Sequence, residues 1–203
     1  MTYTYKVDFF ANIDTDIKAY ILGVFYSRSS GRIQTSLSDF FILELVKSSL
    51  LYSGPIRIYG DSAELHISSR PFLTQLADAG CVASKQHNSL FPTHLGVLLP
   101  HFLRGVFDSY GQIVIVKKRY LNVCLTYNEK FVEGLREFLR DTLHISTKHT
   151  YTSLSSNTIK MLITKQNDAH QFLQWVYYKD FLPSFSRRDR KCLKYQEFLE
   201  KGV

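Results

Sequence analysis

The chain has 203 residues, of which 45% are hydrophobic and 21% are charged. This composition is ordinary for a globular protein and excludes the low-complexity and fibrous classes. No apolar run reaches the roughly 18 residues that a membrane-spanning helix needs. The opening MTYTYKVDFF lacks the charged-then-apolar layout of a signal peptide, so we expect an intracellular protein with no membrane partner.

The net charge of +7 lies in one half of the chain. Residues 1–90 hold eight of the 25 Lys and Arg and eight of the 18 Asp and Glu, so this half is neutral. Residues 91–203 hold the remaining 17 basic and 10 acidic residues. A one-sided positive excess favours a polyanionic partner.

The patterning of residues 1–90 predicts a helix, one strand, a second helix, a hairpin and a short third helix. In that order, these elements are residues 16–27, 31–38, 39–54, 55–67 and 69–80. Gly60 is placed for the hairpin turn and Gly80 for the end of the third helix.

Residues 91–203 predict the fuller order α-β-β-α-β-β-α, followed by a last helix. The elements before the last helix are residues 98–111, 112–127, 128–143, 144–165 and 167–178, of which the second and fourth are hairpins. Asn128 and Asn167 are suited to cap the helices that they begin. Ser186 opens SRRD, which resembles a capping box for the last helix.

The two halves differ in one hairpin. Seven residues separate Gly31 from Asp39, whereas sixteen separate Gly111 from Asn128. One hairpin is therefore reduced or lost in the first half. We predict two repeats on this basis, residues 1–90 and residues 91–203.

Both halves open with a helix that ends in a related sequence, GVFYSRSSG from Gly23 and GVFDSYG from Gly105. FLRGVFDSYGQI and, less closely, AYILGVFYSRSSGRI resemble the motif of the LAGLIDADG homing endonucleases in their single-chain, two-repeat form. The basic and aromatic RRDRKCLKYQEFLEK is similar to the closing helix of that family. The resemblance implies an α+β fold, with two pseudo-symmetric αββαββα repeats packed through a central helix pair and a shortened hairpin in the first repeat.

In that family, the two motif helices approach each other through small residues, for which Gly23 and Gly105 are the expected contacts. The last acid of each motif holds a divalent metal for phosphodiester hydrolysis. That position is Tyr110 in the second motif and Arg28 in the first, or Ser30 if the two-residue insertion of the first motif is placed differently, while Asp108 matches an earlier acid. The resemblance therefore implies a degenerate, catalytically inactive site with no metal and no cofactor.

The sequence offers no obvious substitute for these metal ligands. No Asp or Glu occurs from residue 17 to residue 38, so no other alignment restores an acid to the first motif. An arginine there repels a cation. The three cysteines are isolated and form no CxxC pair, so neither a thiolate zinc site nor a disulfide framework is expected.

The resemblance also implies that each sheet forms half of a saddle over the DNA major groove. Lys160 alternates with apolar residues in 158–163, as a strand with one solvent-facing side requires. Lysines would contact phosphates and threonines would reach base edges. The residues predicted to contact nucleic acid are Lys117, Lys118, Arg119, Lys148, Thr150, Lys160, Arg187, Arg188, Arg190 and Lys191. The predicted function is binding of double-stranded DNA, as a regulator of gene expression.

Three other functions stay open on the sequence. An RNA-binding intron maturase or splicing cofactor would use a surface apart from the cleavage site. A protein-interaction module, or self-association, would cover the 112–127 hairpin, where IVIV is apolar on both faces. A weakly active DNA endonuclease would use Asp108.

Overall fold

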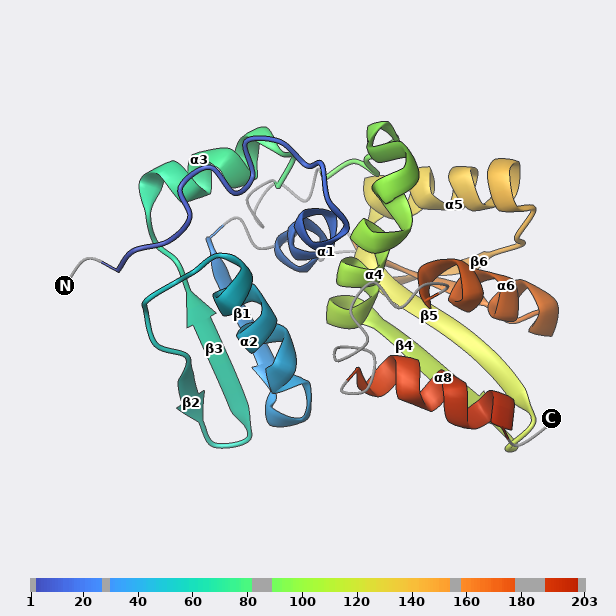
Figure 1. Ribbon diagram of the computed structural model, residues 1–203. Helices are drawn as coiled ribbons and strands as arrows, with labels where there is room; N and C mark the ends of the chain where they lie inside the picture. The colour runs from blue at the N-terminus through green and yellow to red at the C-terminus, as the bar shows by residue number, and fades with distance from the viewer. Residues whose placement is uncertain (1–2, 27–29, 82–88, 154–157, 178–188, 201–203) are drawn as a thin grey trace.

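A pair of helices lies at the centre of the molecule, between two antiparallel sheets (Figure 1). The computed structural model describes residues 3–26, 30–81, 89–153, 158–177 and 189–200. The central helices are α1 (Asp16–Phe25) and α4 (Leu99–Tyr110). The predicted α+β fold class, with two repeats that meet at a helix pair, is confirmed.

Helix α1 is buried because its middle has no polar face. Every residue from Ala19 to Phe25 is buried. Thr15 caps its start, since the Thr15 hydroxyl accepts a hydrogen bond from the Lys18 N–H at 3.4 Å. Helix α1 has 10 residues and is too short to cross a bilayer, and no other described helix is long and apolar enough to do so.

The first repeat has a three-stranded sheet in the order β1-β3-β2. Ile33 pairs with Leu65, and both side chains face the core because alternate strand positions share a face. The elements of this repeat after α1 are β1 (Arg32–Ser36), the short helix η1 (Leu37–Asp39), α2 (Phe40–Ser49), β2 (Arg57–Tyr59), β3 (Ser62–His66) and α3 (Arg70–Asp78).

The second repeat has a four-stranded sheet in the order β4-β5-β7-β6. Helices α5 and α6 pack against one face of it, and that face carries buried residues such as Val123, Met161 and Ile163. The elements of this repeat besides α4 are η2 (Thr93–Leu98), β4 (Gly111–Val116), β5 (Tyr120–Asn128), α5 (Glu129–Leu143), β6 (Lys148–Ser153), β7 (Thr158–Ile163), α6 (Gln166–Tyr177) and α8 (Arg190–Glu200).

The described residues of the first repeat contain no equivalent of strand β4. Strand β1 pairs antiparallel with β3 and leads through η1 into α2, just as β5 pairs antiparallel with β7 and leads into α5. Strand β1 therefore stands in the place of β5. No strand among the described residues stands in the place of β4. The predicted reduction of one hairpin is thus the loss of its first strand.

Two helices of the second repeat test the predicted caps. Asn128 caps α5 as predicted, because its Oδ1 accepts a hydrogen bond from the Phe131 N–H at 3.0 Å. Helix α6 begins at Gln166, so the prediction that Asn167 caps it is wrong. A propensity-based cap is therefore a guide to a helix start only within a residue or two.

The last helix, α8, begins at Arg190. Its cap is Asp189, whose Oδ1 accepts hydrogen bonds from the N–H groups of Lys191 at 3.0 Å and Cys192 at 3.1 Å. The predicted cap at Ser186 lies outside the described residues. Asp189 is the last residue of the SRRD motif. The motif therefore supplies the cap of α8 through its aspartate.

Candidate nucleic-acid interface

Helices α1 and α4 touch backbone to backbone at two glycines. A Cβ atom on Gly23 would overlap the carbonyl oxygen of Phe102. A Cβ atom on Gly105 would overlap the carbonyl oxygen of Tyr20. These contacts are equivalent under a pseudo-two-fold axis, because matching positions differ by the same 82 residues (105 minus 23 and 102 minus 20). The two predicted glycines are therefore the points of closest approach between the repeats.

The same offset aligns the two helix ends. With this offset, Tyr110 of the second repeat is equivalent to Arg28 of the first, and Asp108 is equivalent to Tyr26. Arg28 lies outside the described residues. Tyr110 is half-buried at the end of α4, with its ring edge-on to that of Tyr127 at 5.2 Å between centroids. The end of α4 thus presents a phenol at the position where the motif has its last acid.

Asp108, the acid that survives on α4, points into the protein. Its side chain is 2% exposed. Tyr20 donates a hydrogen bond to its Oδ2 at 3.1 Å, and Tyr177 donates one to its Oδ1 at 2.8 Å. Arg104 Nε lies 3.9 Å from Oδ2. Both carboxylate oxygens therefore have hydrogen-bond partners in the core.

Arg104 joins the helix pair to the last helix. It is among the largest fully buried side chains of the protein, and its Nη2 donates a hydrogen bond to Asp189 Oδ2 at 2.9 Å. Its guanidinium lies over the Tyr177 ring, 4.9 Å from the centroid. Arg104 and Asp108 are four residues apart in an apolar helix, which indicates a buried ion pair. The sequence-based prediction missed this signal.

Lys191, which the sequence predicts to contact nucleic acid, is bonded to the backbone of α4. Its Nζ donates hydrogen bonds to the carbonyl oxygens of Phe107 at 2.7 Å and Asp108 at 2.6 Å, in the last turn of α4. A cation is stabilised there because the carbonyl end of a helix carries partial negative charge. Lys194 is engaged in a similar way, since its Nζ donates to the Ile113 carbonyl oxygen of β4 at 2.8 Å.

Burial raises the pKa of Asp108 to about 7. The neighbouring Asp189 carboxylate adds to the rise in pKa, while Arg104 and Lys191 oppose it. The charged and titratable groups that face this carboxylate come from α1, α4, α6 and the start of α8, and they are Tyr20, Arg104, Tyr177, Asp189 and Lys191.

This raised pKa predicts that stability falls as pH rises toward 7. The unfolded chain releases the Asp108 proton near pH 4, whereas the folded protein keeps it until about pH 7. The contribution of Asp108 to the free energy of unfolding is therefore largest below about pH 4 and is lost as the pH rises to about 7. Asp108→Asn should flatten the decline. Urea unfolding of both proteins from about pH 4.5 to pH 8 checks this, and parallel pH profiles would contradict it.

The outer face of the second sheet, which lies opposite α5 and α6, gathers several of the predicted contact residues. Thr126, Lys160 and Thr150 form a row across β5, β7 and β6. Thr150 is exposed, while Thr126 and Lys160 are half-buried. The neighbouring row is Gln112, Cys124, Leu162 and Lys148. Lys148, Thr150 and Lys160 therefore share one solvent-facing surface.

The other predicted cations lie at two separate places. Lys117, Lys118 and Arg119 are exposed in the turn between β4 and β5. Arg190 is on α8, where its Nη2 lies 3.1 Å from Asp39 Oδ2, although its side chain remains 60% exposed. Arg187 and Arg188 lie outside the described residues. The turn therefore continues the outer face of the sheet, whereas α8 bridges to the first repeat.

The outer face of the first sheet carries Glu64 and two arginines. Gln34 and Arg57 both pair with Glu64, and Arg32 is two residues before Gln34 on β1, so all four side chains share this face. Arg32 Nη1 is 3.2 Å from Glu64 Oε2, whose side chain is only 9% exposed. Glu64 therefore offsets one of the two arginines on this face.

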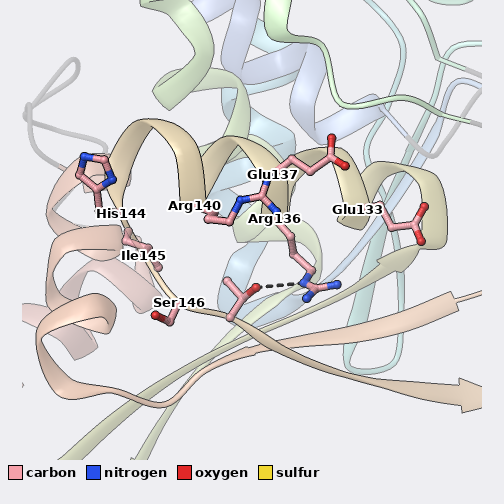
Figure 2. A pocket seen from close by; sticks show the side chains of 8 residues that line it. Glu133, Arg136, Glu137, Arg140, His144, Ile145 and Ser146 are labelled. Atoms are coloured by element: carbon pink, nitrogen blue, oxygen red, sulfur yellow. Dashed lines mark hydrogen bonds between the residues drawn. The ribbon is translucent and has the colours of Figure 1, made fainter.

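A surface hollow of ≈ 720 Å³ lies beside α5 and the chain that leads to β6 (Figure 2). Its lining alternates in charge along α5, with Glu133, Arg136, Glu137 and Arg140. Arg136 is held by Thr147, because its Nε donates to the Thr147 Oγ1 at 3.0 Å. Mixed charges give no net attraction for a polyanion, and α5 is on the other side of the sheet from the outer face.

The sequence itself matches no protein-family model and no curated protein. Solved structures do match. The N-terminal LAGLIDADG domain of DUF199/WhiA has a TM-score of 0.57 at 16% identity, over 87% of this chain and 92% of that one. The meganuclease I-SmaMI bound to uncleaveable DNA has a TM-score of 0.63 at 13% identity, over 90% and 88%. The chain has a LAGLIDADG fold. I-DmoI in complex with its target DNA also matches, with a TM-score of 0.54 at 14% identity, over 81% and 97%.

The motif resemblance predicts metal ligands at the ends of α1 and α4. The described part of the chain contains no group of three or more His, Cys, Asp or Glu side chains placed to hold a metal ion. At the end of α4, the Lys191 ammonium is bonded to two carbonyl oxygens of the last turn. The functional groups among the described residues at the end of α4 are the Tyr110 phenol, the Lys191 ammonium and the buried Asp108 carboxylate.

Proposed function

We propose that this protein binds duplex DNA through the outer face of its four-stranded sheet and does not cleave it. The observation that carries the proposal is the row of Thr126, Lys160 and Thr150, with Lys148 in the neighbouring row. Threonine hydroxyls donate and accept hydrogen bonds, so they suit base edges, and the lysines suit phosphates. The major groove admits β-strands of this kind. I-SmaMI and I-DmoI, which share the fold, are both in complex with DNA.

The absence of cleavage is proposed from the residues at the end of α4. Metal-assisted hydrolysis of a phosphodiester needs carboxylates that reach the ion. Tyr110 occupies the expected position, and Asp108 is directed into the core by two tyrosine hydroxyls. Binding without cleavage acts by occupying the DNA, so we assign the protein a regulatory role in gene expression.

The test is the salt dependence of binding to duplex DNA. Lys148→Ala and Lys160→Ala should each weaken binding about tenfold at low salt, since each removes a charged hydrogen bond. Each should also lower the slope of log K against log salt by about one. Fluorescence anisotropy with a labelled duplex measures both quantities. Lys130→Ala is the matched control, because Lys130 is exposed on α5, and it should bind like the unaltered protein.

The other readings give different results in the same assays. A flat salt response, or unchanged affinity in both lysine variants, would contradict the proposed surface. Preference for structured RNA over duplex DNA would favour a maturase-like role. Cleavage in magnesium or manganese that Asp108→Asn abolishes would show that the protein is an endonuclease.

A further inference from the structure

The outer face of the second sheet changes character toward the turn of the β4–β5 hairpin. Val114, Val116 and Tyr120 are 41%, 37% and 55% exposed there. Val116 pairs with Tyr120, and Val114 is the next residue of β4 on the same face. These three side chains form an apolar strip at the hairpin end of a face whose other exposed residues include Gln112, Lys148 and Thr150.

The surroundings of the apolar strip favour a polyanion as its occupant. The exposed Lys117 and Lys118 lie beyond it in the turn. Both residues have left-handed backbones, with φ of 51° and 58°, which Gly or Asn would adopt at lower cost. The turn therefore holds two cations at positions where the backbone favours other residues. Lys160 and Lys148 lie on the same face of the sheet but farther from this turn, on β7 and β6, so the basic part of the face continues beyond the strip.

We propose that the apolar strip contacts thymine C5-methyl groups in the major groove, so that the bound duplex is rich in A·T pairs under the β4–β5 hairpin. This inference rests on the proposed function. Among the groups that base pairs present in the major groove, the thymine methyl is the apolar one, and it is matched by apolar side chains. The polar row of Thr126, Lys160 and Thr150 suits hydrogen-bonding base edges instead.

The spacing of the apolar strip agrees with this assignment. Val114 and Val116 are two residues apart on one strand, so their side chains are separated by about 6.7 Å. Successive base pairs rise by about 3.4 Å, so the two valines span about two base-pair steps. Tyr120 extends the strip onto β5, and a two-stranded ribbon is of a size that the major groove admits.

The experiment removes the methyl groups and nothing else. The tightest-binding duplex is selected from a random-sequence pool and is then made again with deoxyuridine in place of every thymine. Charge and hydrogen-bonding edges are unchanged by this replacement. The unaltered protein should bind the deoxyuridine duplex about fourfold more weakly for each contacted methyl, the value of burying one such group. The salt slope should be the same for both duplexes, because the phosphates are the same.

Variants of the strip should lose this discrimination while they still bind. Threonine resembles valine in shape and suits a strand, so Val114→Thr and Val116→Thr should fold normally and bind both duplexes with more nearly equal affinity. Val97→Thr is the control, because Val97 is 88% exposed on η2, and it should discriminate like the unaltered protein.

Three outcomes would overturn the inference in distinguishable ways. Equal affinity of the unaltered protein for the thymine and deoxyuridine duplexes, with steep salt dependence, would overturn it and leave the proposed function standing. No binding to any selected duplex would overturn both. A dimer in light scattering that Val114→Thr converts to a monomer would assign the apolar strip to self-association instead of DNA.

Discussion

Replacing Gly105 with alanine should lower the free energy of unfolding by more than about 3 kcal/mol. The added methyl group would overlap the carbonyl oxygen of Tyr20, which is backbone and cannot rotate away. Helices α1 and α4 would have to separate, and the packing on both sides of them would loosen. Helix propensity alone predicts the opposite sign, a gain of about 1 kcal/mol. Urea unfolding followed by circular dichroism measures the change.

Two further variants control for the nature of the substitution. Gly23→Ala should be as severe as Gly105→Ala, because the two contacts are equivalent. Gly60→Ala should cost only about 1 kcal/mol, since Gly60 has a left-handed backbone, with φ of 54°, but open space around it. A Gly105→Ala protein as stable as the Gly60→Ala protein would show that the helices do not approach as closely as the structure has them.

The parts of the fold that were predictable are those with local signals. The second sheet follows from the β-branched and aromatic residues of 112–127 and the alternation in 158–163, and its helices follow from 3.6-residue periodicity. Asn128 was correct as a cap because its hydrogen bond to Phe131 spans only three residues. The short spacing from Gly31 to Asp39 indicated a reduced hairpin. Which of its strands was lost became clear only from the pairing of β1 with β3.

Apart from the Arg104 and Asp108 spacing within α4, the buried charge network was not predictable, because its other members are distant in sequence. Arg104 and Asp189 are 85 residues apart, and Lys191 reaches the end of α4 across 84 residues. A basic run such as RRDRKCLK reads as a solvent-facing surface when it is taken alone. Its lysines turn inward because the open carbonyls of α4 and the edge of β4 need hydrogen-bond donors.

Of the two surfaces expected to contact DNA, the sheet and the last helix, this difference leaves the sheet as the one with available cations. Lys191 and Lys194 bond to backbone carbonyls of α4 and β4, so α8 covers the free edge of β4 and closes the last turn of α4. The cations left for phosphates among the described residues of the second repeat are chiefly those of the outer face and the β4–β5 turn. The family resemblance implies DNA binding, and the hydrogen bonds of the lysine side chains show which cations are available to contact phosphates.

Removing Asp189 should be as damaging as opening the helix pair. Asp189→Ala takes the nearest carboxylate away from Arg104, whose side chain is 1% exposed, and breaking a buried ion pair costs about 3–5 kcal/mol. It also removes the cap of α8, worth about 1 kcal/mol. Asp189→Asn keeps the cap and should be milder by about that amount, as urea unfolding of the two variants will show.

The double variant Arg104→Met with Asp189→Asn separates charge from packing. Removing both partners leaves no uncompensated charge in that pair, so most of the lost stability should return. Asp141→Ala is the surface control, because Asp141 pairs with Arg140 in solvent, with side chains 62% and 69% exposed, and its loss should leave unfolding unchanged. An Asp189→Ala protein that unfolds like the Asp141→Ala protein would mean that α8 is held to the helix pair by apolar contacts alone, with Arg104 finding another partner inside the core.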